Sequence, residues 1–360
     1  DNFYSSMLVY IRSAFDSTHG GFGTEQKFPM IPVLELLLHN AEAHNDAEDM
    51  LMVTQTLDAM LAGEIFDKEN GGIFRYATRR DWTSPHYEKI LDDNSKMIPI
   101  LLRVARHTGD NRYLNTAFDI IDYIQDSLYD PFSGLFRGSQ DANETYYLTP
   151  LVQRYGITPP KIDSACYIAS NAKMIDALLA ASQFKGHINL IDRAVTIANT
   201  ISLLPQAIDK TLPHYIECHE PLSNKKRQTK LDVQGYGYLD DMVYTSIAYL
   251  RLFQTTREHI WLEKSINTVD TIIKEFTLPN GALSDISQRL NSQRGFVTSH
   301  IPLDLNARTV ILLLDLISNT GNNEYRTIVD SILLSTYTLC ENYGLLAADY
   351  ALAIGLRAQE

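Results

Sequence analysis

Residues 67–94, DKENGGIFRYATRRDWTSPHYEKILDDN, join a glycine turn, a short apolar and aromatic segment and the expected start of a helix. The turn and the segment are residues 70–76, NGGIFRY. Ser84 is a residue type that caps helices and Pro85 fits a first helical position, and apolar residues then recur at helical spacing. The stretch therefore predicts a turn followed by a helix over residues 86–108.

The same kind of turn recurs along the chain. It begins at six places, spaced by roughly 50 to 80 residues, which are Gly20, Gly71, Ser133, Leu212, Asn280 and Asn342. With two helical patterns between successive turns, the period suggests six helical hairpins in a ring closed on itself, with the turns at one end. An open solenoid is the alternative, but its repeats would be more uniform in length and sequence.

Helical periodicity covers most of the remaining sequence. The predicted helices are residues 4–15, 32–43, 46–63, 86–108, 110–128, 166–184, 187–203, 236–256, 258–276, 304–320, 322–341 and 345–357. Thr108-Gly109-Asp110 and Thr320-Gly321-Asn322 combine a helix-ending glycine with a capping residue, which predicts tight antiparallel hairpins. Alternation typical of strands longer than four residues is absent. Residues 139–165 and 204–235 are predicted to be long irregular insertions, and residues 1–360 to form a single domain.

Composition excludes several classes of function. The chain has 45% hydrophobic and 21% charged residues and a formal charge of −13. This balance is typical of a globular core and argues against nucleic acid or an anionic membrane as a partner, because both require a basic surface. No apolar run approaches the ~18 residues of a membrane span. The three cysteines lack metal-site spacing and indicate reduced thiols, which weakly favours a cytoplasmic location.

The motifs resemble a known family, the thioredoxin-domain-containing proteins related to spermatogenesis-associated protein 20. The similarity is carried by residues 20–29 (GGFGTEQKFP), 71–76 (GGIFRY), Trp82, 85–89 (PHYEK), 93–94 (DN), 140–142 (QDA), Asn171 with 174–175 (MI), and 239–241 (LDD). The resemblance implies an all-α fold, an (α/α)6 toroid with short β-turn segments at the pocket end. Such a fold is similar to N-acylglucosamine 2-epimerases and six-hairpin glycosidases.

The resemblance also implies a thioredoxin-like domain ahead of this region, which the present sequence does not contain, and hence a possible thioredoxin-like partner. The chain departs from the family pattern at three positions, which are Arg79, Asn143 and Met242. Arg79 and Asn143 stand where the family usually or often has Asp, and Met242 where it usually has Tyr.

The candidate catalytic residues gather in residues 75–93. His86, Lys89 and Asp93 would share one face of the predicted helix. The positive end of the helix dipole would keep His86 neutral, so His86 could be a general acid or base with Asp93 as its orienter. Glu88 has either a catalytic role or that of a solvated helix charge. Arg75 follows a glycine pair and could bind a carboxylate or vicinal hydroxyls.

Further candidates come from other parts of the sequence. Asp141, Asp240 and Asp241 stand at turn-to-helix junctions, and a pair of carboxylates is what glycosidic cleavage requires. Epimerisation instead requires bases on opposite sides of a sugar carbon, which His86 with either His214 or His300 could supply. Aromatic residues at the same junctions could stack on sugar rings, although core packing is an alternative for them. The residues assigned to substrate binding are Arg75, Tyr76, Trp82, Lys89, Asp141, Asp240, Tyr238 and His214.

These residues predict a carbohydrate-directed enzyme, foremost an epimerase or isomerase without metal or cofactor. His86 would act as acid and base, with Asp241 as a second polar anchor. The alternatives are a glycoside hydrolase that uses paired aspartates, and a non-catalytic sugar-binding or scaffold module acting with a thioredoxin-like protein.

Overall fold

The computed structural model describes residues 2–218, 231–294 and 299–360, and it is mainly helical. Backbone contacts divide the chain into two compact units. Unit 1 consists of residues 1–13, 201–215 and 233–360, and unit 2 of residues 14–200 and 216–232. Among the described residues, no helix has both the length and the apolar content needed to cross a bilayer.

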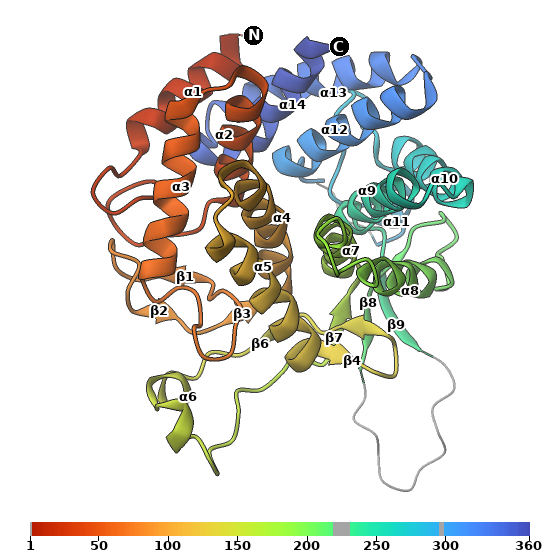
Figure 1. Ribbon diagram of the computed structural model, residues 1–360. Coiled ribbons are helices and arrows are strands. Elements are labelled where there is room, and N and C mark those ends of the chain that lie inside the picture. The colour runs from red at the N-terminus through yellow and green to blue at the C-terminus, as the bar shows by residue number, and fades with distance from the viewer. Residues whose placement is uncertain (1, 219–230, 295–298) are drawn as a thin grey trace, which may run out of the picture. The chain divides into compact units, whose positions relative to one another are not determined.

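Unit 2 is built from neighbouring helical hairpins. Helix α2 packs on α3 and α4 on α5, and α4 also contacts α2 and α7 (Figure 1). Their bounds, with those of α8, are α2 Ile31–His44, α3 Ala47–Ala62, α4 Leu91–Thr108, α5 Asn111–Tyr123, α7 Ile168–Ser182 and α8 Leu190–Ser202. Helix α2 buries side chains around most of its circumference, whereas α5 buries a stripe at Tyr113, Ala117 and Ile120. The first helix of each hairpin therefore supplies the centre of the core and the second covers it.

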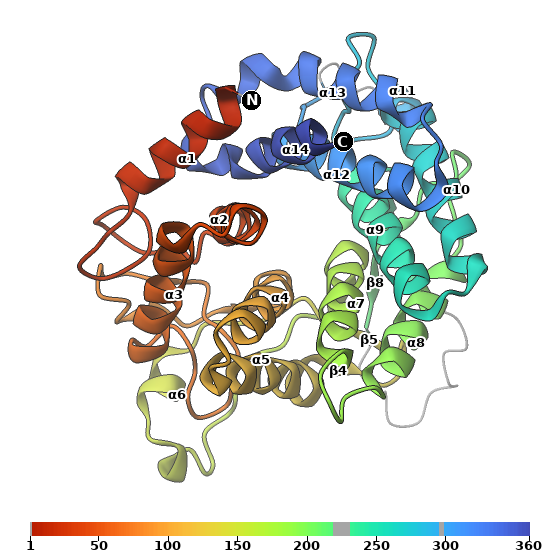
Figure 2. The ribbon, with the colours of Figure 1, turned by 45° about the horizontal axis from the view of Figure 1, so that its top comes forward.

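Unit 1 repeats the same plan. Helix α9 packs on α10 and α12 on α13, and α12 also contacts α9 and α14 (Figure 2). The bounds of the unit 1 helices are α1 Asn2–Ala14, α9 Leu239–Thr256, α10 His259–Phe276, α11 Gln288–Arg294, α12 Leu303–Thr320, α13 Tyr325–Cys340 and α14 Ala348–Gln359. All twelve predicted helices are present within a few residues, apart from the start of α4.

The hairpin ends follow the predicted capping signals. Gly109 ends α4 with φ 72° and Gly321 ends α12 with φ 71°, a left-handed conformation that glycine adopts without a steric penalty. The Asp110 carboxylate then accepts a hydrogen bond from the Arg112 amide at 2.8 Å, which caps α5. The Thr-Gly-Asp/Asn signals are therefore confirmed as hairpin ends.

Four of the predicted turns fold the apolar segment back on the end of the preceding helix. The pairings are antiparallel and join Phe15 to Phe22, Phe66 to Ile73, Thr277 to Leu283, and strand β4 (Tyr129–Asp130) to strand β5 (Leu135–Phe136). At Gly72 the φ angle is 82°, and a Cβ atom there would lie 2.6 Å from the Tyr123 ring. Only glycine fits this turn, because any side chain would collide with the aromatic ring.

An asparagine in the following helix fixes three of these apolar segments. Asn94 accepts a hydrogen bond from the Ile73 amide at 2.7 Å and donates to the Ile73 carbonyl at 3.0 Å. Asn171 makes the same pair of bonds to Phe136, and Asn306 makes it to Leu283. Each asparagine is the fourth residue of its helix, so the turn-to-helix junction repeats in three dimensions as the sequence period predicted.

The predicted helix over 86–108 begins late. Strand β1 (Tyr76–Ala77) pairs with β2 (Pro85–His86), and β3 (Lys89–Ile90) pairs with β6 (Ser139–Gln140), so α4 starts only at Leu91. Ser84 has φ 52° and does not cap the helix. The prediction that His86, Lys89 and Asp93 share one helical face was therefore wrong, because strand pairing with distant residues outweighed the local capping signal.

The two long insertions contain regular structure that the sequence did not indicate. Residues 139–165 include the short helix α6 (Glu144–Leu148), and residues 204–235 include strand β8 (Pro213–Glu217). Strand β9 (Asp232–Tyr236) follows, and strand β7 (Ala165–Tyr167) precedes α7. Strands of five residues therefore occur where no strand longer than four residues was predicted. The middle of the second insertion, residues 219–230, lies outside the described residues.

Candidate functional site

In unit 2, the β1–β2 hairpin holds a cluster of aromatic and charged side chains. Tyr76 stacks on Phe28 at 4.8 Å and on His86 at 5.3 Å between ring centroids. Arg75 donates a hydrogen bond to the Glu88 carboxylate at 3.0 Å, and the His86 Nε2 atom lies 3.6 Å from the same carboxylate. The His86 side chain is 39% exposed, so the cluster can meet a ligand from solvent.

His86 is therefore not placed by a helix dipole, as the sequence suggested. It is held by stacking on Tyr76 and by the neighbouring Glu88. The structure brings Arg75, Tyr76, His86 and Glu88 together as predicted.

Lys89 has a structural position rather than a substrate-binding one. Its side chain is 0% exposed, and its Nζ atom donates to the Asp67 carboxylate and to the Gly71 carbonyl, both at 2.7 Å. Nζ also lies 4.2 Å from the centre of the Tyr123 ring. Burial lowers the pKa of Lys89 to about 8, against the opposing effect of Asp67. Lys89 stabilises the glycine turn from inside the unit, which corrects its assignment to substrate binding.

Trp82 is also a core residue. It is 0% exposed, and its indole nitrogen donates to the His19 carbonyl at 2.9 Å. A Cβ atom on Gly21 would lie 2.6 Å from the Trp82 ring, which shows how closely the ring packs against that turn. A buried ring offers no face to a sugar, so the assignment of Trp82 to substrate binding is corrected as well.

Two adjacent carboxyl groups in the first turn of α4 have opposite environments. Burial alone would raise the pKa of Asp92, but ion pairs with Lys173 and Lys96 outweigh it and hold this pKa well below its usual range. For Asp93, burial and the negative charge of Asp92 raise the pKa to about 6. Arg75 and Lys96 oppose that rise only in part. Asp93 therefore keeps its proton up to about pH 6, while Asp92 stays ionised.

In unit 1, strand β8 and helix α9 together form a histidine–aspartate pair. The His214 Nδ1 atom lies 2.8 Å from the Asp241 Oδ2 atom, and Asp241 is 0% exposed. Burial favours the neutral imidazole, but the hydrogen bond to Asp241 and the charges of Asp241 and Asp240 outweigh it and raise the pKa of His214. The Tyr238 ring lies 4.6 Å from the imidazole, which remains 27% exposed. The arrangement is that of an oriented general acid or base.

Oxygen and nitrogen atoms of His214, Asp240 and Asp241 lie within 4.8 Å of one another, which is close enough for these residues to hold a cation. In the arrangement observed, however, His214 and Asp241 bond to each other, and Asp240 accepts a hydrogen bond from the Asp241 amide at 2.9 Å. A cation would have to replace the bond between His214 and Asp241. The donor set as it stands therefore fits proton transfer better than metal binding.

Asp141 directly follows Gln140, which pairs with Lys89 where strands β3 and β6 meet in unit 2. It is exposed, and only its backbone amide makes a bond, to the Lys161 carbonyl at 2.8 Å, among the interactions described. The role of Asp141 in substrate binding stays a prediction.

Asp92 and Lys173 are candidate residues that the sequence reasoning missed. A signal for Asp92 was present, because Leu-Asp-Asp occurs both at 91–93 and at 239–241. Each triplet opens a helix, so Asp93 and Asp241 occupy the same helical position in two repeats of the junction. The repeated triplet is therefore a sequence signal for Asp92. No such signal marks Lys173, which lies 81 residues further along the chain.

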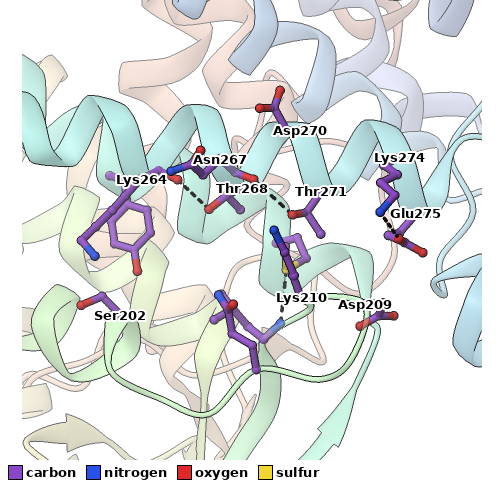
Figure 3. A pocket seen from close by; sticks show the side chains of 14 residues that line it. Ser202, Asp209, Lys210, Lys264, Asn267, Thr268, Asp270, Thr271, Lys274 and Glu275 are labelled. Carbon is purple, nitrogen blue, oxygen red and sulfur yellow. Dashed lines mark hydrogen bonds and ion pairs between the residues drawn. The ribbon is translucent and has the colours of Figure 1, made fainter.

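A separate polar cavity of about 470 Å³ lies in unit 1 beside α10 (Figure 3). Figure 3 shows the Lys264 side chain extending toward Ser202 and that of Lys210 toward Thr271. None of the predicted site residues lines this cavity. Its lining consists of Ser202, Gln206, Asp209, Lys210, Leu212, Met242, Tyr249, Lys264, Asn267, Thr268, Asp270, Thr271, Lys274 and Glu275.

No family model matches the chain. Part of it is similar to spermatogenesis-associated protein 20 of Mus musculus, with 32% identity over 143 residues, which is 39% of this chain and 18% of that protein. An uncharacterized protein of Caenorhabditis elegans is 31% identical over 149 residues, 39% of this chain and 20% of that protein. The matched segment thus spans about a fifth of these relatives. The family resemblance seen in the motifs is confirmed.

Solved structures share the fold over nearly the whole chain. Cellobiose 2-epimerase from Spirochaeta thermophila matches with a TM-score of 0.73 and 13% identity, over 99% of this chain and 96% of that chain. A D-mannose isomerase matches with a TM-score of 0.70 and 12% identity, over 93% of this chain and 84% of that chain. A family 76 glycoside hydrolase (mannosidase) from Bacteroides thetaiotaomicron matches at 0.69 and 11% identity, over 100% of both chains. These matches confirm the predicted all-α fold of the (α/α)6 class, which this chain shares with carbohydrate-active enzymes.

Proposed function

We propose that this chain is a carbohydrate-directed enzyme that epimerises or isomerises a sugar by proton transfer, with His214 as its acid and base. The observation that supports this most directly is the 2.8 Å bond between His214 Nδ1 and the buried Asp241. The fold shared with a sugar epimerase and a sugar isomerase agrees with the proposal.

The chemistry follows from the orientation of the imidazole. In the neutral ring, a hydrogen bond from Nδ1–H to Asp241 makes Nε2 the basic nitrogen. A base at Nε2 can remove the proton from the carbon next to the carbonyl of an open-chain sugar. The resulting imidazolium is stabilised by Asp241 and Asp240, whose charges raise the pKa of His214. The same nitrogen can then return the proton to the neighbouring carbon, which isomerises the sugar. Epimerisation additionally requires a second acid on the opposite face of the carbon.

Considered by itself, the unit 2 cluster is a second candidate sugar site, because it has groups that suit a polyhydroxylated ligand. Arg75 offers donors and Glu88 offers acceptors, and the exposed edge of the Tyr76–His86 stack offers an aromatic surface. For a ligand bound at this cluster, we propose Arg75 and Tyr76 as binding residues and His86 and Glu88 as candidates for proton transfer.

The direct test is hydrogen exchange at carbon. The chain is incubated in deuterated water with cellobiose or D-mannose, and loss of the sugar C2 proton is followed by NMR. The wild type should exchange the proton, while His214→Gln and Asp241→Asn should slow exchange by about 10²-fold or more. His107→Gln, at an exposed histidine in the last turn of α4, is the matched control. Full exchange activity in His214→Gln would reject the assignment.

A second candidate, glycoside hydrolysis, is supported by the Asp92–Asp93 pair. A glycosidase requires one carboxylic acid that is protonated at the working pH and one carboxylate that is ionised, and the two environments provide this difference below about pH 6. Hydrolysis would be favoured if the chain releases reducing ends from a manno-oligosaccharide, and if this activity is lost in Asp93→Asn but retained in His214→Gln. A Tm that rises with added sugar, without either reaction, would favour a sugar-binding module. The predicted partner of such a module is a thioredoxin-like protein.

A further inference from the structure

Two cysteines that are 52 residues apart in sequence meet inside unit 2. The Cys166 Sγ atom, on strand β7, lies 2.7 Å from the Cys218 Sγ atom, which follows strand β8 directly. Both side chains are buried. The Cys218 amide donates to the Ser164 carbonyl at 2.6 Å, so the two backbone segments are already joined beside the sulfurs.

A metal ion is a poorer explanation of this pair than a covalent bond. Thiolates that share a tetrahedral zinc ion at about 2.3 Å each would lie roughly 3.8 Å apart, well beyond the 2.7 Å observed. The nearby carboxylate of Asp130 completes a possible ligand set. Its oxygens, however, already accept hydrogen bonds from the Ser133 amide, the Ser133 hydroxyl and the Arg137 guanidinium.

The third cysteine provides an internal comparison. Cys340 is buried in α13, and its Sγ atom lies 2.6 Å from the Tyr337 carbonyl oxygen. Among the described residues, the sulfur of Cys340 contacts this carbonyl and not another thiol. Burial alone therefore does not bring sulfurs together in this protein, and the pairing of Cys166 with Cys218 is specific to the β7–β8 region.

We propose that Cys166 and Cys218 form a reversible disulfide that links strand β7 to the end of strand β8. This site is independent of the sugar chemistry proposed above. Because β8 also carries His214, the disulfide would fix the strand only four residues from the proposed base.

The oxidation balances with a low-molecular-mass disulfide as the co-reactant. The Cys218 thiolate attacks one sulfur of oxidised glutathione, which breaks that S–S bond and releases one glutathione thiolate. Cys166 then loses its proton and attacks the Cys218 sulfur of the mixed disulfide, which releases the second glutathione. Two protein thiols are oxidised, one glutathione disulfide is reduced, and the two protons end on the two glutathione thiols.

The test measures thiols at equilibrium, approached from both directions. Native chain, and chain refolded from denaturant, are each held in the same buffer of oxidised and reduced glutathione, then acid-quenched, alkylated and analysed by peptide mass mapping. We expect a Cys166–Cys218 cross-link in nearly all molecules under oxidising conditions, with Cys340 alkylated. Reduction should return three alkylated cysteines.

Variants separate the possible outcomes. Cys340→Ser should keep the cross-link, while Cys166→Ser and Cys218→Ser should each abolish it. Failure of the wild type to cross-link from either direction would overturn the proposal. Stoichiometric zinc in the purified chain, lost in Cys166→Ser, would overturn it in favour of a metal site.

Discussion

The replacement of Asp93 by asparagine should stabilise the protein, and the gain should grow with pH. The Asp93 carboxyl lies at the start of α4, where burial and the charge of Asp92 raise its pKa from 3.8 to about 6. An acid whose folded-state pKa is raised favours the folded state when protonated and weakens it when ionised. The wild type therefore loses stability as the pH rises from about 4 to about 6, and asparagine removes that loss.

The magnitude follows from the pKa difference between the folded and unfolded chains. At about 1.4 kcal/mol for each tenfold change in proton affinity, ionising Asp93 costs roughly 3 kcal/mol at pH 8 and about 0.5 kcal/mol at pH 4. The pKa already includes the interaction of the charge with the helix N-terminus, so the net gain from asparagine at pH 8 is about 3 kcal/mol. For a chain of this length the gain corresponds to roughly 4 °C in Tm.

The assay is thermal and urea unfolding of the wild type and Asp93→Asn between pH 4 and pH 8. Asp126→Asn is the matched control, since Asp126 is exposed and has no ion pair or side-chain hydrogen bond among the described residues. The control should change little at any pH. A stability difference for Asp93→Asn that stays constant with pH would refute the argument, because an altered pKa must appear as a pH dependence.

Three further predictions concern buried polar groups. Asn171→Ala should lower the free energy of unfolding in urea by roughly 2–4 kcal/mol, because the backbone groups that Asn171 bonds stay buried without a partner. A decrease under about 0.5 kcal/mol would contradict this. Lys89→Met should cost about 3–5 kcal/mol at pH 7, because it leaves the Asp67 carboxylate buried without its cation. The loss of stability in Lys89→Met should become smaller at low pH, where Asp67 is protonated. A loss that does not change with pH would contradict this prediction. Asp241→Asn should move the pKa of His214 below 6.5, because burial lowers this pKa and the charge of Asp241 that raises it is removed. An NMR titration of His214 that is unchanged would contradict this prediction.

Sequence reasoning succeeded where the signal was local. Gly109 followed by Asp110 carries both the helix-ending glycine and the capping carboxylate of the next helix, so the hairpin could be read from neighbouring residues. The glycine turns were recognisable for the same reason, since left-handed backbone at positions such as Gly72 excludes other residues. Their recurrence then indicated the repeat, and the fold class followed.

It failed where a distant partner decided the structure. The Ser84-Pro85 pair looks like a helix start, but Lys89-Ile90 pairs with Ser139-Gln140 far along the chain, so the helix begins only at Leu91. Lys89 looks like a charged rim residue, yet its ion pair with Asp67 allows it to be fully buried. The sequence shows the residue type but not the partner, and for ionisable and aromatic side chains the partner determines whether they face solvent.

The repeated junction explains why carboxylates at one helical position can differ so much in chemistry. Asp93 and Asp241 each occupy the third position of a helix that follows a short strand. The fourth residue of α4, Asn94, fixes the preceding segment with two hydrogen bonds, whereas in α9 that place is taken by Met242, whose sulfur accepts one bond from the Leu212 amide at 3.4 Å. A thioether is a weak acceptor, so the segment leading to His214 is held less firmly by its helix. The bond from His214 to Asp241 therefore has to position the imidazole, and this makes Asp241→Asn the more informative variant for the proposed proton transfer.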